Sequence, residues 1–431
     1  MDGGSRTLLR VEQLIDGTGA DPVTNAAILI DGSMIDWVGP ATALPSDRRV
    51  EGVSQEFVGA TALPGFVDAH AHFSLFADGR SYENMAAETD ERMAIAGAKN
   101  AWVHLRSGIT TARDNGARNR LGFELRDAIE RGVIEGPRLL VSGRPITTTG
   151  GHFHWCNGTA DGEDEIRETV RRLVREQADH IKIMASGGGT IGTDPGRASY
   201  SLEELRAAVA TAHDLDRLTT AHCRAAEAMG RAIEAGSDCL EHGEFLEPDG
   251  VMRFDDDLAK RLVASGIYLS PTMAASGWDA ILRLRDRRER AGLTESEERD
   301  LTAAERETET RIEHVGRLIE LGMGPRIVAG TDAGCFDFSF GHLDYSIQLL
   351  ARAGMTVMEA IVTATSASAA ACGVDQIVGT LAPSKRADIL IVDGNPLLDL
   401  DAISKVRAVF KDGTAIGRAG IDGVTAQPSR A

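Results

Sequence analysis

Residues 63–72 read Leu-Pro-Gly-Phe-Val-Asp-Ala-His-Ala-His, an apolar run that ends in two histidines one residue apart. The branched and aromatic side chains predict a buried β-strand over Gly65–His70, because such side chains pack well on a pleated surface. Alternate residues of a strand share a face, so His70 and His72 can direct their imidazoles to the same point. The stretch therefore predicts a strand that ends in a pair of candidate metal ligands.

Seven further strand candidates follow, and helical patterns separate several of them. Helices are predicted over Leu202–His213 and Ala225–Ala235, and Ser201 is a suitable N-cap for the first. Eight strands alternating with helices over about 300 residues predict an α/β fold of the (β/α)8 TIM-barrel type. The alternation also fits a doubly wound sheet, so periodicity alone does not choose between them. The further strands are predicted at Gly108–Asp114, Arg138–Ser142, Ile181–Met184, Leu218–His222, Asp238–His242, Ile267–Pro271 and Arg326–Asp332.

The two ends of the chain have a different pattern, in which short apolar runs alternate with turn dipeptides. Residues 26–38 predict a β-hairpin, because Asp31-Gly32 suits the turns that match the twist of paired strands. Residues 387–392 and 406–410 predict strands of the same kind. We therefore expect one small β-sandwich domain built from both termini. The predicted domains are residues 1–62 and 376–431 for the two parts of the β-sandwich and residues 63–375 for the barrel.

Composition excludes several classes of protein. The 431 residues include 46 Lys or Arg and 65 Asp or Glu, for a formal net charge of −19, which argues against nucleic acid and anionic membrane surfaces as partners. No apolar run is long enough to span a membrane. The five cysteines form no CxxC pair, which favours a reducing compartment. Since the N-terminus also lacks the pattern of a signal peptide, we expect a cytoplasmic protein.

Residues with metal-binding chemistry gather at the predicted strand ends. Imidazole and carboxylate groups are ligands that zinc and similar divalent metals prefer, and the C-terminal ends of barrel strands meet at one mouth. Lys182 lies among apolar residues, where burying an ammonium is unfavourable unless it is paired or modified. A single histidine is more often packed or exposed than a ligand, but the whole set predicts a metal site. The set is His70, His72, Lys182, His222, His242 and Asp332.

Three motifs resemble those of the amidohydrolase superfamily of metal-dependent hydrolases. Residues 63–72 resemble its first-strand motif, residues 181–188 (Ile-Lys-Ile-Met-Ala-Ser-Gly-Gly) its fourth-strand motif, and residues 379–388 (Gly-Thr-Leu-Ala-Pro-Ser-Lys-Arg-Ala-Asp) the return into its β domain. The pattern is most similar to the prolidase-like branch, which includes Xaa-Pro dipeptidase-type peptidases and some hydrolases of amide, carbamate and urea xenobiotics. The resemblance covers nearly the whole chain.

The resemblance implies a binuclear centre of two divalent metal ions, which we expect to be zinc. Carbon dioxide would carbamylate Lys182, and the new carboxylate would bridge the two ions. This modification would also replace a stranded buried cation with a metal-bound anion. The remaining ligands would be His70, His72 and Asp332 for one ion and His222 and His242 for the other.

The implied reaction is hydrolysis of an amide C–N bond. Two cations lower the pKa of a bridging water, and the resulting hydroxide would attack the carbonyl while Asp332 acts as general base and then general acid. His152 is the candidate donor to the developing oxyanion, because residues 149–154 (Thr-Gly-Gly-His-Phe-His) resemble a loop of the branch that carries a substrate-contacting histidine. Residues 153–155 depart from the usual small residue and acid of that loop. His154 and Tyr200 are further candidate substrate contacts.

The leading hypothesis for the substrate is a dipeptide or an N-acyl amino acid. Carbamates, phenylureas and other xenobiotic amides form one alternative, and a cyclic amide cleaved by a one-metal enzyme of the imidazolonepropionase type forms another. Lys182 argues against the one-metal enzyme. A metal-binding protein without activity or a purely structural assembly subunit is a third hypothesis, which the presence of all six candidate ligands disfavours. We expect a small-molecule partner and, from the resemblance, a homo-oligomer.

Residues 282–320 are dense in charges of both signs and predict an exposed helix or helical pair. Such a segment is most simply a solvated surface. A lid over the site and an oligomer contact are the other two hypotheses.

Overall fold

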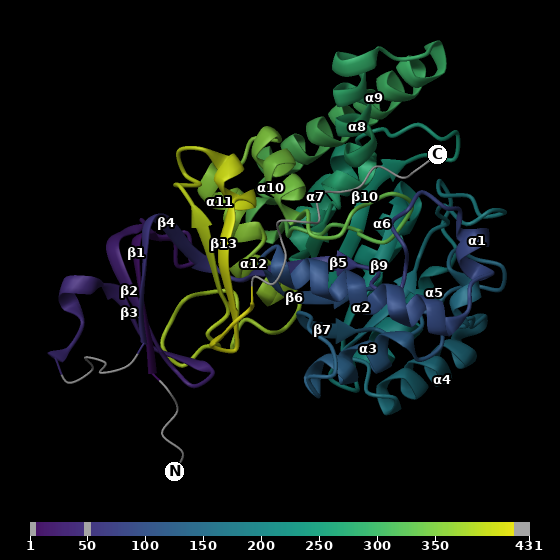
Figure 1. Cartoon of the computed structure of the whole chain (residues 1–431). Helices are drawn as coiled ribbons and strands as arrows, with labels where there is room; N and C mark the ends of the chain where they lie inside the picture. Colours follow the sequence, from purple (N-terminus) through teal and green to yellow (C-terminus); the bar gives the residue numbers. More distant parts are fainter. Residues whose placement is uncertain (1–5, 47–52, 418–431) are drawn as a thin grey trace.

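The computed structural model describes residues 6–46 and 53–417, which form a β domain beside an α/β body (Figure 1). One seven-stranded sheet, in the order β14-β13-β12-β4-β1-β2-β3, combines the two ends of the chain. The predicted hairpin is confirmed as β2 and β3. The strands are β1 (Arg6–Leu14), β2 (Val23–Asp31), β3 (Met34–Pro40), β4 (Val53–Pro64), β12 (Ile389–Asp393), β13 (Val406–Lys411) and β14 (Thr414–Ala415).

Strand β4 joins the N-terminal and C-terminal halves of this sheet. It pairs in parallel with β1 and antiparallel with β12. Leu9 and Ile28 from one half share a buried core with Ile391 and Phe410 from the other. The two halves thus pack on each other, as the predicted sandwich requires. The predicted domain boundaries stay predictions.

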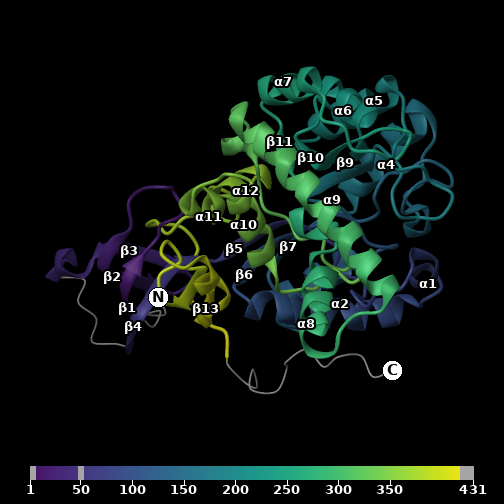
Figure 2. The same ribbon diagram turned by 90° about the horizontal axis from the view of Figure 1, so that it is seen from above.

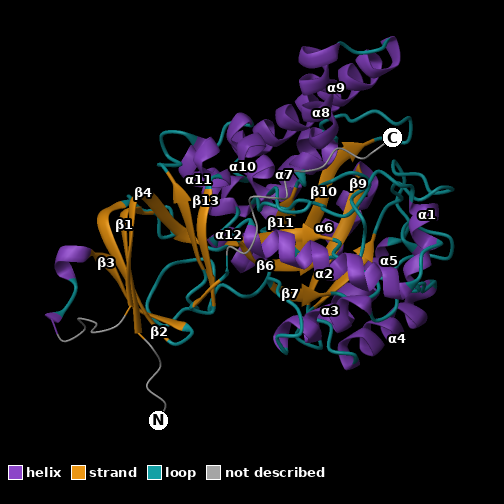
Figure 3. Ribbon diagram, in the orientation of Figure 1, coloured by secondary structure: helices purple, strands orange, loops and turns teal. Residues whose placement is uncertain are grey.

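Parallel strands form the centre of the α/β body, in the orders β5-β6-β7 and β11-β10-β9-β8 (Figure 3). Strands β5, β6, β8 and β10 are buried at every position, as expected for strands covered on both faces. Seven of the eight predicted barrel strands are present. They are β5 (Phe66–Ala71), β6 (Ile109–Asp114), β7 (Arg138–Val141), β8 (His180–Met184), β9 (Leu218–Ala225), β10 (Cys239–Leu246) and β11 (Tyr268–Ser270).

The eighth predicted strand, Arg326–Asp332, is not a regular strand. Arg326 ends a 3₁₀ turn, and the backbone at Asp332 turns into the left-handed region with φ of +55°. The residues between them still connect the two sheets: Val328 N–H donates to Leu269 O (2.9 Å), and Ala69 N–H donates to Ala329 O (3.0 Å). The segment therefore takes the place of the eighth strand, but it is joined to its neighbours by isolated hydrogen bonds instead of a continuous ladder of them.

The opposite seam between the sheets closes through Ile146. Its N–H donates to Lys182 O and its carbonyl accepts from Met184 N–H, both at 2.8 Å. Strands β7 and β8 are thereby connected, and the strands follow one another around a ring. The chain has the TIM-barrel architecture with a β domain that the sequence predicted.

Helices cover the outside of the strands (Figures 2 and 3). Ser201 caps α5 in a reciprocal capping box with Glu204, which confirms the predicted cap. None of the described helices is long and apolar enough to cross a bilayer. The helices are α1 (Tyr82–Ala86), α2 (Asp90–Arg106), α3 (Leu121–Glu130), α4 (Gly162–Arg175), α5 (Leu202–His213), α6 (Ala226–Ala235), α7 (Asp256–Ser265), α8 (Trp278–Ala291), α9 (Glu295–Glu320), α10 (Leu343–Arg352), α11 (Val357–Thr363) and α12 (Ser366–Ala371).

Helices α8 and α9 form the predicted charged helical pair, which extends away from the barrel at the top of Figure 1. Ile281 and Leu301 are fully buried within the pair. Outward, Arg287 and Glu297 form an ion pair at 2.8 Å, and Thr294 begins α9 with a capping box. Apolar contacts therefore hold the base of the pair, and charges solvate its outer surface.

Candidate metal centre and active site

All six predicted ligands lie at the mouth of the barrel and are buried, at most 8% exposed. Parallel strands direct their carboxyl ends to the same edge, which brings together residues far apart in the sequence. The ligands come from the end of β5 and the residue that follows it, from β8, β9 and β10, and from the segment that replaces the eighth strand. In chain order they are His70, His72, Lys182, His222, His242 and Asp332.

The first group consists of His70, His72 and Asp332. Nε2 of His70 lies 3.2 Å and Nε2 of His72 lies 3.4 Å from Oδ1 of Asp332. The two Nε2 atoms are 3.3 Å apart. Ligand atoms of His70, His242 and Asp332 also lie within 4.8 Å of one another. Two imidazoles and one carboxylate that converge in this way suit a divalent cation.

The second group consists of His222 and His242, whose Nδ1 and Nε2 atoms face each other at 2.9 Å. The outer nitrogen of each ring has another partner: Nε2 of His222 donates to Gly187 O at 3.1 Å, and Nδ1 of His242 contacts Thr272 Oγ1 at 2.8 Å. Burial holds the pKa of both imidazoles well below the usual value, so both rings are neutral near pH 7. Two facing nitrogen lone pairs fit a shared cation.

Lys182 is 1% exposed, and its Nζ makes no hydrogen bond within the described residues. Burial lowers the pKa of this amine, although the charges of Glu241 and Asp332 act in the opposite direction. An unpaired buried ammonium is costly. The donor set of imidazoles, one carboxylate and an amine without a partner fits a metal centre in which the amine is modified.

Two of the predicted ligands have strained backbones. His242 has φ of +70° and Asp332 has φ of +55°, in the left-handed region that non-glycine residues rarely adopt. Strain of this kind costs about 1–3 kcal/mol per residue and persists where the surrounding structure determines it. The surrounding fold therefore holds these two side chains toward the mouth of the barrel although their backbone conformations are strained.

Glu241 orients the first histidine and was missed by the sequence analysis. Nδ1 of His70 donates to its Oε2 at 2.7 Å, which leaves Nε2 of His70 free for a metal. Arg113 (3.0 Å) and Asn115 (3.2 Å) donate to the other carboxylate oxygen. Burial alone would raise the pKa of Glu241, but His70 and Arg113 hold it well below its usual range. An acidic residue inside a predicted strand, directly before the candidate ligand His242, was the signal available in the sequence.

Asp68 also positions His70 and, through Thr331, the segment that carries Asp332. Its carboxylate accepts from His70 N–H (3.0 Å), from the Thr331 hydroxyl (2.6 Å) and from Nε2 of His104 (2.9 Å). It thereby ties β5 to the segment that carries Asp332. This network fixes two predicted ligands relative to each other.

His152 lies beside the second group, with its ring centroid 4.7 Å from that of His222. The Thr190 hydroxyl accepts from Phe153 N–H and lies 2.9 Å from Nδ1 of His152, so it can donate its proton to Nδ1 and leave Nε2 as an N–H donor. A Cβ at residue 188 would lie 2.5 Å from this Nε2, which explains the glycine there. Burial lowers the pKa of His152 well below the usual value, so the imidazole is neutral.

The two other predicted substrate contacts are not brought to this site. Tyr200 is 1% exposed, and its hydroxyl donates to Ala160 O at 2.8 Å within the core. His154 is exposed, and its Nδ1 donates to Gly151 O at 3.0 Å. Neither residue lines the cavity over the predicted ligands. The prediction of substrate contacts at these two positions is therefore not supported.

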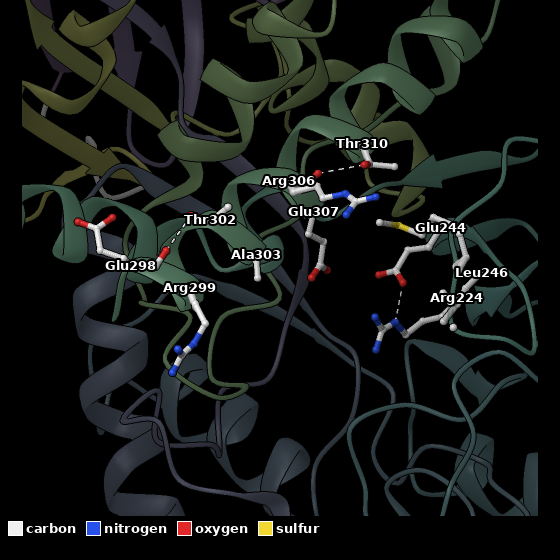
Figure 4. A pocket seen from close by; sticks show the side chains of 13 residues that line it. Arg224, Glu244, Leu246, Glu298, Arg299, Thr302, Ala303, Arg306, Glu307 and Thr310 are labelled. Carbon is white, nitrogen blue, oxygen red and sulfur yellow. Dashed lines mark hydrogen bonds and ion pairs between the residues drawn. The ribbon is translucent and has the colours of Figure 1, made fainter. Parts of the chain in front are cut away.

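An inner cavity of about 210 Å³ opens over the predicted ligands. An outer cavity of about 790 Å³ adjoins it, and the two share Arg224, Glu244 and Glu307 in their walls. Figure 4 shows the outer cavity, where residues of α9 face residues of β9 and β10. In Figure 2, α9 runs across the view of these strands. Part of the charged helical pair thus forms a wall of the approach to the site.

Aromatic side chains line one side of the inner cavity. Tyr82, Phe153, Phe336 and Phe338 all line it, and the rings of Tyr82 and Phe336 contact each other with centroids 4.9 Å apart. Cys335 lies next to them as a buried thiol, and burial raises its pKa well above the usual value. These residues make one side of the cavity apolar, in contrast to the charged side that faces α9.

The carboxyl group of Asp114 is buried below this site. Burial raises its pKa from 3.8 to about 7, and its Oδ2 has no hydrogen-bond partner within the described residues. In metal-free protein the folded state thus keeps a proton that the unfolded chain releases, so this group makes the free energy of unfolding fall as pH rises from about 4 to 7. Asp114→Asn removes this dependence, so between pH 5 and 8 its free energy of unfolding should rise relative to that of the wild type by up to about 3 kcal/mol. Urea unfolding of both metal-free proteins from pH 5 to 8 measures the difference; parallel pH profiles would contradict it.

Comparison with known proteins places this chain in a family. Residues 61–416 match the Amidohydrolase family. Ochratoxinase of Aspergillus niger is 28% identical over 438 aligned residues, which cover 95% of this chain and 85% of the relative. Its crystal structure matches with a TM-score of 0.79 at 25% identity and covers 95% of both chains.

Two further solved structures match. A Xaa-Pro dipeptidase with methionine bound in its active site has a TM-score of 0.81 at 28% identity, over 96% of this chain and 100% of that chain. Phenylurea hydrolase B has a TM-score of 0.79 at 21% identity, over 98% and 100%, a likeness that shows the fold alone. The family match spans the whole barrel and extends into the strands of the β domain at both ends. The chain therefore belongs to the amidohydrolase family of hydrolases that act on C–N bonds.

Proposed function

We propose that this protein is a binuclear metal-dependent hydrolase that cleaves the amide bond of dipeptides or N-acyl amino acids. Membership of the amidohydrolase family supports hydrolysis of a C–N bond. The observation that carries the binuclear centre is the convergence of four imidazoles and one carboxylate around a buried amine that has no hydrogen-bond partner within the described residues.

Two divalent ions, zinc in this proposal, would polarise the substrate carbonyl and lower the pKa of water. A carbamate on Lys182 would be common to both ions, which gives the unpaired amine a role and removes its buried positive charge. The other ligands would be His70, His72 and Asp332 for one ion and His222 and His242 for the other.

Asp332 would move the proton. Its carboxylate lines the inner cavity, and although burial alone would raise its pKa, hydrogen bonds and charge from His70 and His72 hold that pKa well below the usual value. The group is thus ionised near pH 7 and able to accept a proton from the attacking water. The same proton can then be donated to the amine that leaves.

His152 would hold the carbonyl oxygen through Nε2–H. We expect His152→Ala to lower kcat by roughly 10²- to 10³-fold, the usual effect of removing an oxyanion donor. Metal content should not change, because His152 is not among the proposed ligands. Initial rates and elemental analysis measure the two effects. His154→Ala is the matched control, since this exposed histidine of the same loop lies outside the cavity; equal losses in both variants would contradict the role.

Carbamates and phenylureas form the second candidate substrate class. The aromatic side of the inner cavity favours it as much as it favours an amino acid with an apolar side chain. These substrates would use the same metal centre and the same roles of Asp332 and His152. Only the products distinguish the two classes.

The test is to incubate zinc-loaded protein with a mixed library of dipeptides, N-acyl amino acids, carbamates and phenylureas, and to identify products by mass spectrometry. The proposal predicts release of amino acids, and the Asp332→Asn protein serves as the inactive control. Cleavage confined to carbamates or ureas would overturn the proposed substrate class. The absence of any turnover would overturn the proposed activity.

We also propose a cytoplasmic location and a homo-oligomeric state. All five cysteines are free, and four of them are buried, which is typical of proteins from a reducing compartment. The oligomeric state rests on the resemblance to the family and is checked by light scattering of the purified protein.

A further inference from the structure

Arg224 occupies the junction between the metal centre and the approach to it. It follows His222 by two residues in β9, so both side chains lie on the same face of that strand. Its side chain is 28% exposed and lines both the inner and the outer cavity. A molecule in contact with the predicted ligand His222 thus has this guanidinium within a short reach, since two residues of a strand span about 7 Å.

Buried ion pairs hold Arg224 in place. Its Nε donates to Oε2 of Glu244 at 2.7 Å, and Glu244 is 2% exposed at its side chain. Arg311 of α9 donates to the other oxygen of Glu244 and, at 3.2 Å, to Glu307. In Figure 4 the guanidinium of Arg224 extends from the strand into the space that α9 faces. Glu244 therefore fixes the orientation of the Arg224 side chain, and Arg311 holds Glu244 in place.

This cluster has more hydrogen-bond donors than acceptors. Each guanidinium offers five N–H groups, but within the described residues the terminal nitrogens of Arg224 make no hydrogen bond. Nε and Nη1 of Arg311 are buried and also have no partner there. The two carboxylates are already engaged by these same arginines. The unpaired N–H groups of this cluster therefore need a ligand with acceptor oxygens, and a ligand that offers only donors would not pair with them.

We propose that Arg224 binds a free carboxylate of the substrate through its two terminal nitrogens. This inference rests on the proposed function and narrows it: in a dipeptide or an N-acyl amino acid the bound carboxylate belongs to the amino acid that is released. Planar guanidinium and carboxylate groups pair through two parallel hydrogen bonds, which is stronger and more specific than a neutral contact. Glu244 and Arg311 act as positioning residues, and a neutral phenylurea would leave Arg224 without its partner.

A pair of probes that differ only in the carboxylate tests the proposal. We choose N-acetyl-L-phenylalanine and N-acetylphenethylamine, because the second has a hydrogen in place of the carboxylate and both suit the aromatic side of the cavity. The zinc-loaded wild type should prefer the first probe by kcat/KM. Arg224→Gln should lower kcat/KM for the first probe by roughly 10- to 100-fold, mostly by raising KM. Its kcat/KM for the second probe should change little. Arg206→Gln, which removes an exposed arginine of α5 outside both cavities, should behave as the wild type.

Binding without turnover provides a second measurement. Titration calorimetry with N-acetyl-L-phenylalanine on the Asp332→Asn protein, with and without Arg224→Gln, should show binding only when Arg224 is present, and Arg224→Lys should restore part of it. Melting temperature and metal content of each variant check that the site is intact. A wild type that cleaves both probes equally overturns this inference and leaves the proposed function standing. Failure to cleave any amide overturns the proposed function, whereas equal binding to both proteins in calorimetry overturns the role of Arg224.

Discussion

Lys182→Ala is expected to reduce amide hydrolysis by roughly 10³-fold or more and to leave at most one tightly bound metal ion per chain. The amine is buried without a hydrogen-bond partner among the described residues, so burying it as an ammonium costs free energy. In the proposed centre its role would come from the modified form, which would supply oxygen ligands to the two ions. Initial rates together with elemental analysis of the zinc-loaded variant measure both losses.

The stability of a second variant, Lys182→Met, gives an independent check on the role of Lys182. Removing an unpaired buried amine should leave the free energy of unfolding of metal-free Lys182→Met equal to or above that of the metal-free wild type. Zinc should then stabilise the wild type more than the variant, because a ligand that binds only the folded state raises its stability. A variant with two bound ions and full activity would contradict the bridging role.

Asp332→Asn is expected to lower kcat by roughly 10³- to 10⁴-fold with a smaller change in KM. The amide oxygen can still bind a metal, but an amide cannot accept the proton that the carboxylate accepts. Asp332→Ala should lose metal as well as kcat, because it removes the proposed ligand oxygen beside His70 and His72. Comparing metal content and kcat in these two variants separates the two roles. Retention of wild-type kcat in Asp332→Asn would contradict the proton transfer.

Local sequence signals were sufficient to predict most of the fold. Strand β8 could be predicted from Ile181, Ile183 and Met184, since both of its faces are buried. Ser201 with Glu204 is a helix cap that can be recognised in the sequence. The eighth segment was predicted as a strand because its residues are apolar. Its hydrogen bonds depend on the left-handed backbone at Asp332 and on partners in β5 and β11, which no local pattern encodes.

The same distinction applies to the site. The six predicted ligands were recognisable because they are chemically unusual at strand ends, and the structure brings all of them to one mouth. Glu241 was missed because its partners His70 and Arg113 lie 171 and 128 residues away along the chain. Tyr200 follows the loop after β8, as a substrate contact could, but its hydroxyl is engaged by the Ala160 carbonyl, 40 residues away. Side-chain partners of this kind come from the tertiary structure.

The number of metal ions bound by the reconstituted protein tests the bridging carbamate on Lys182. Metal-free wild type and Lys182→Ala would be loaded with zinc in buffer with bicarbonate and in buffer free of carbon dioxide, and zinc per chain would be counted by elemental mass spectrometry alongside activity. With a bridging carbamate, two ions and full activity are expected only for the wild type with bicarbonate. Two ions and full activity in Lys182→Ala, or in wild type without carbon dioxide, would contradict a bridging carbamate on Lys182.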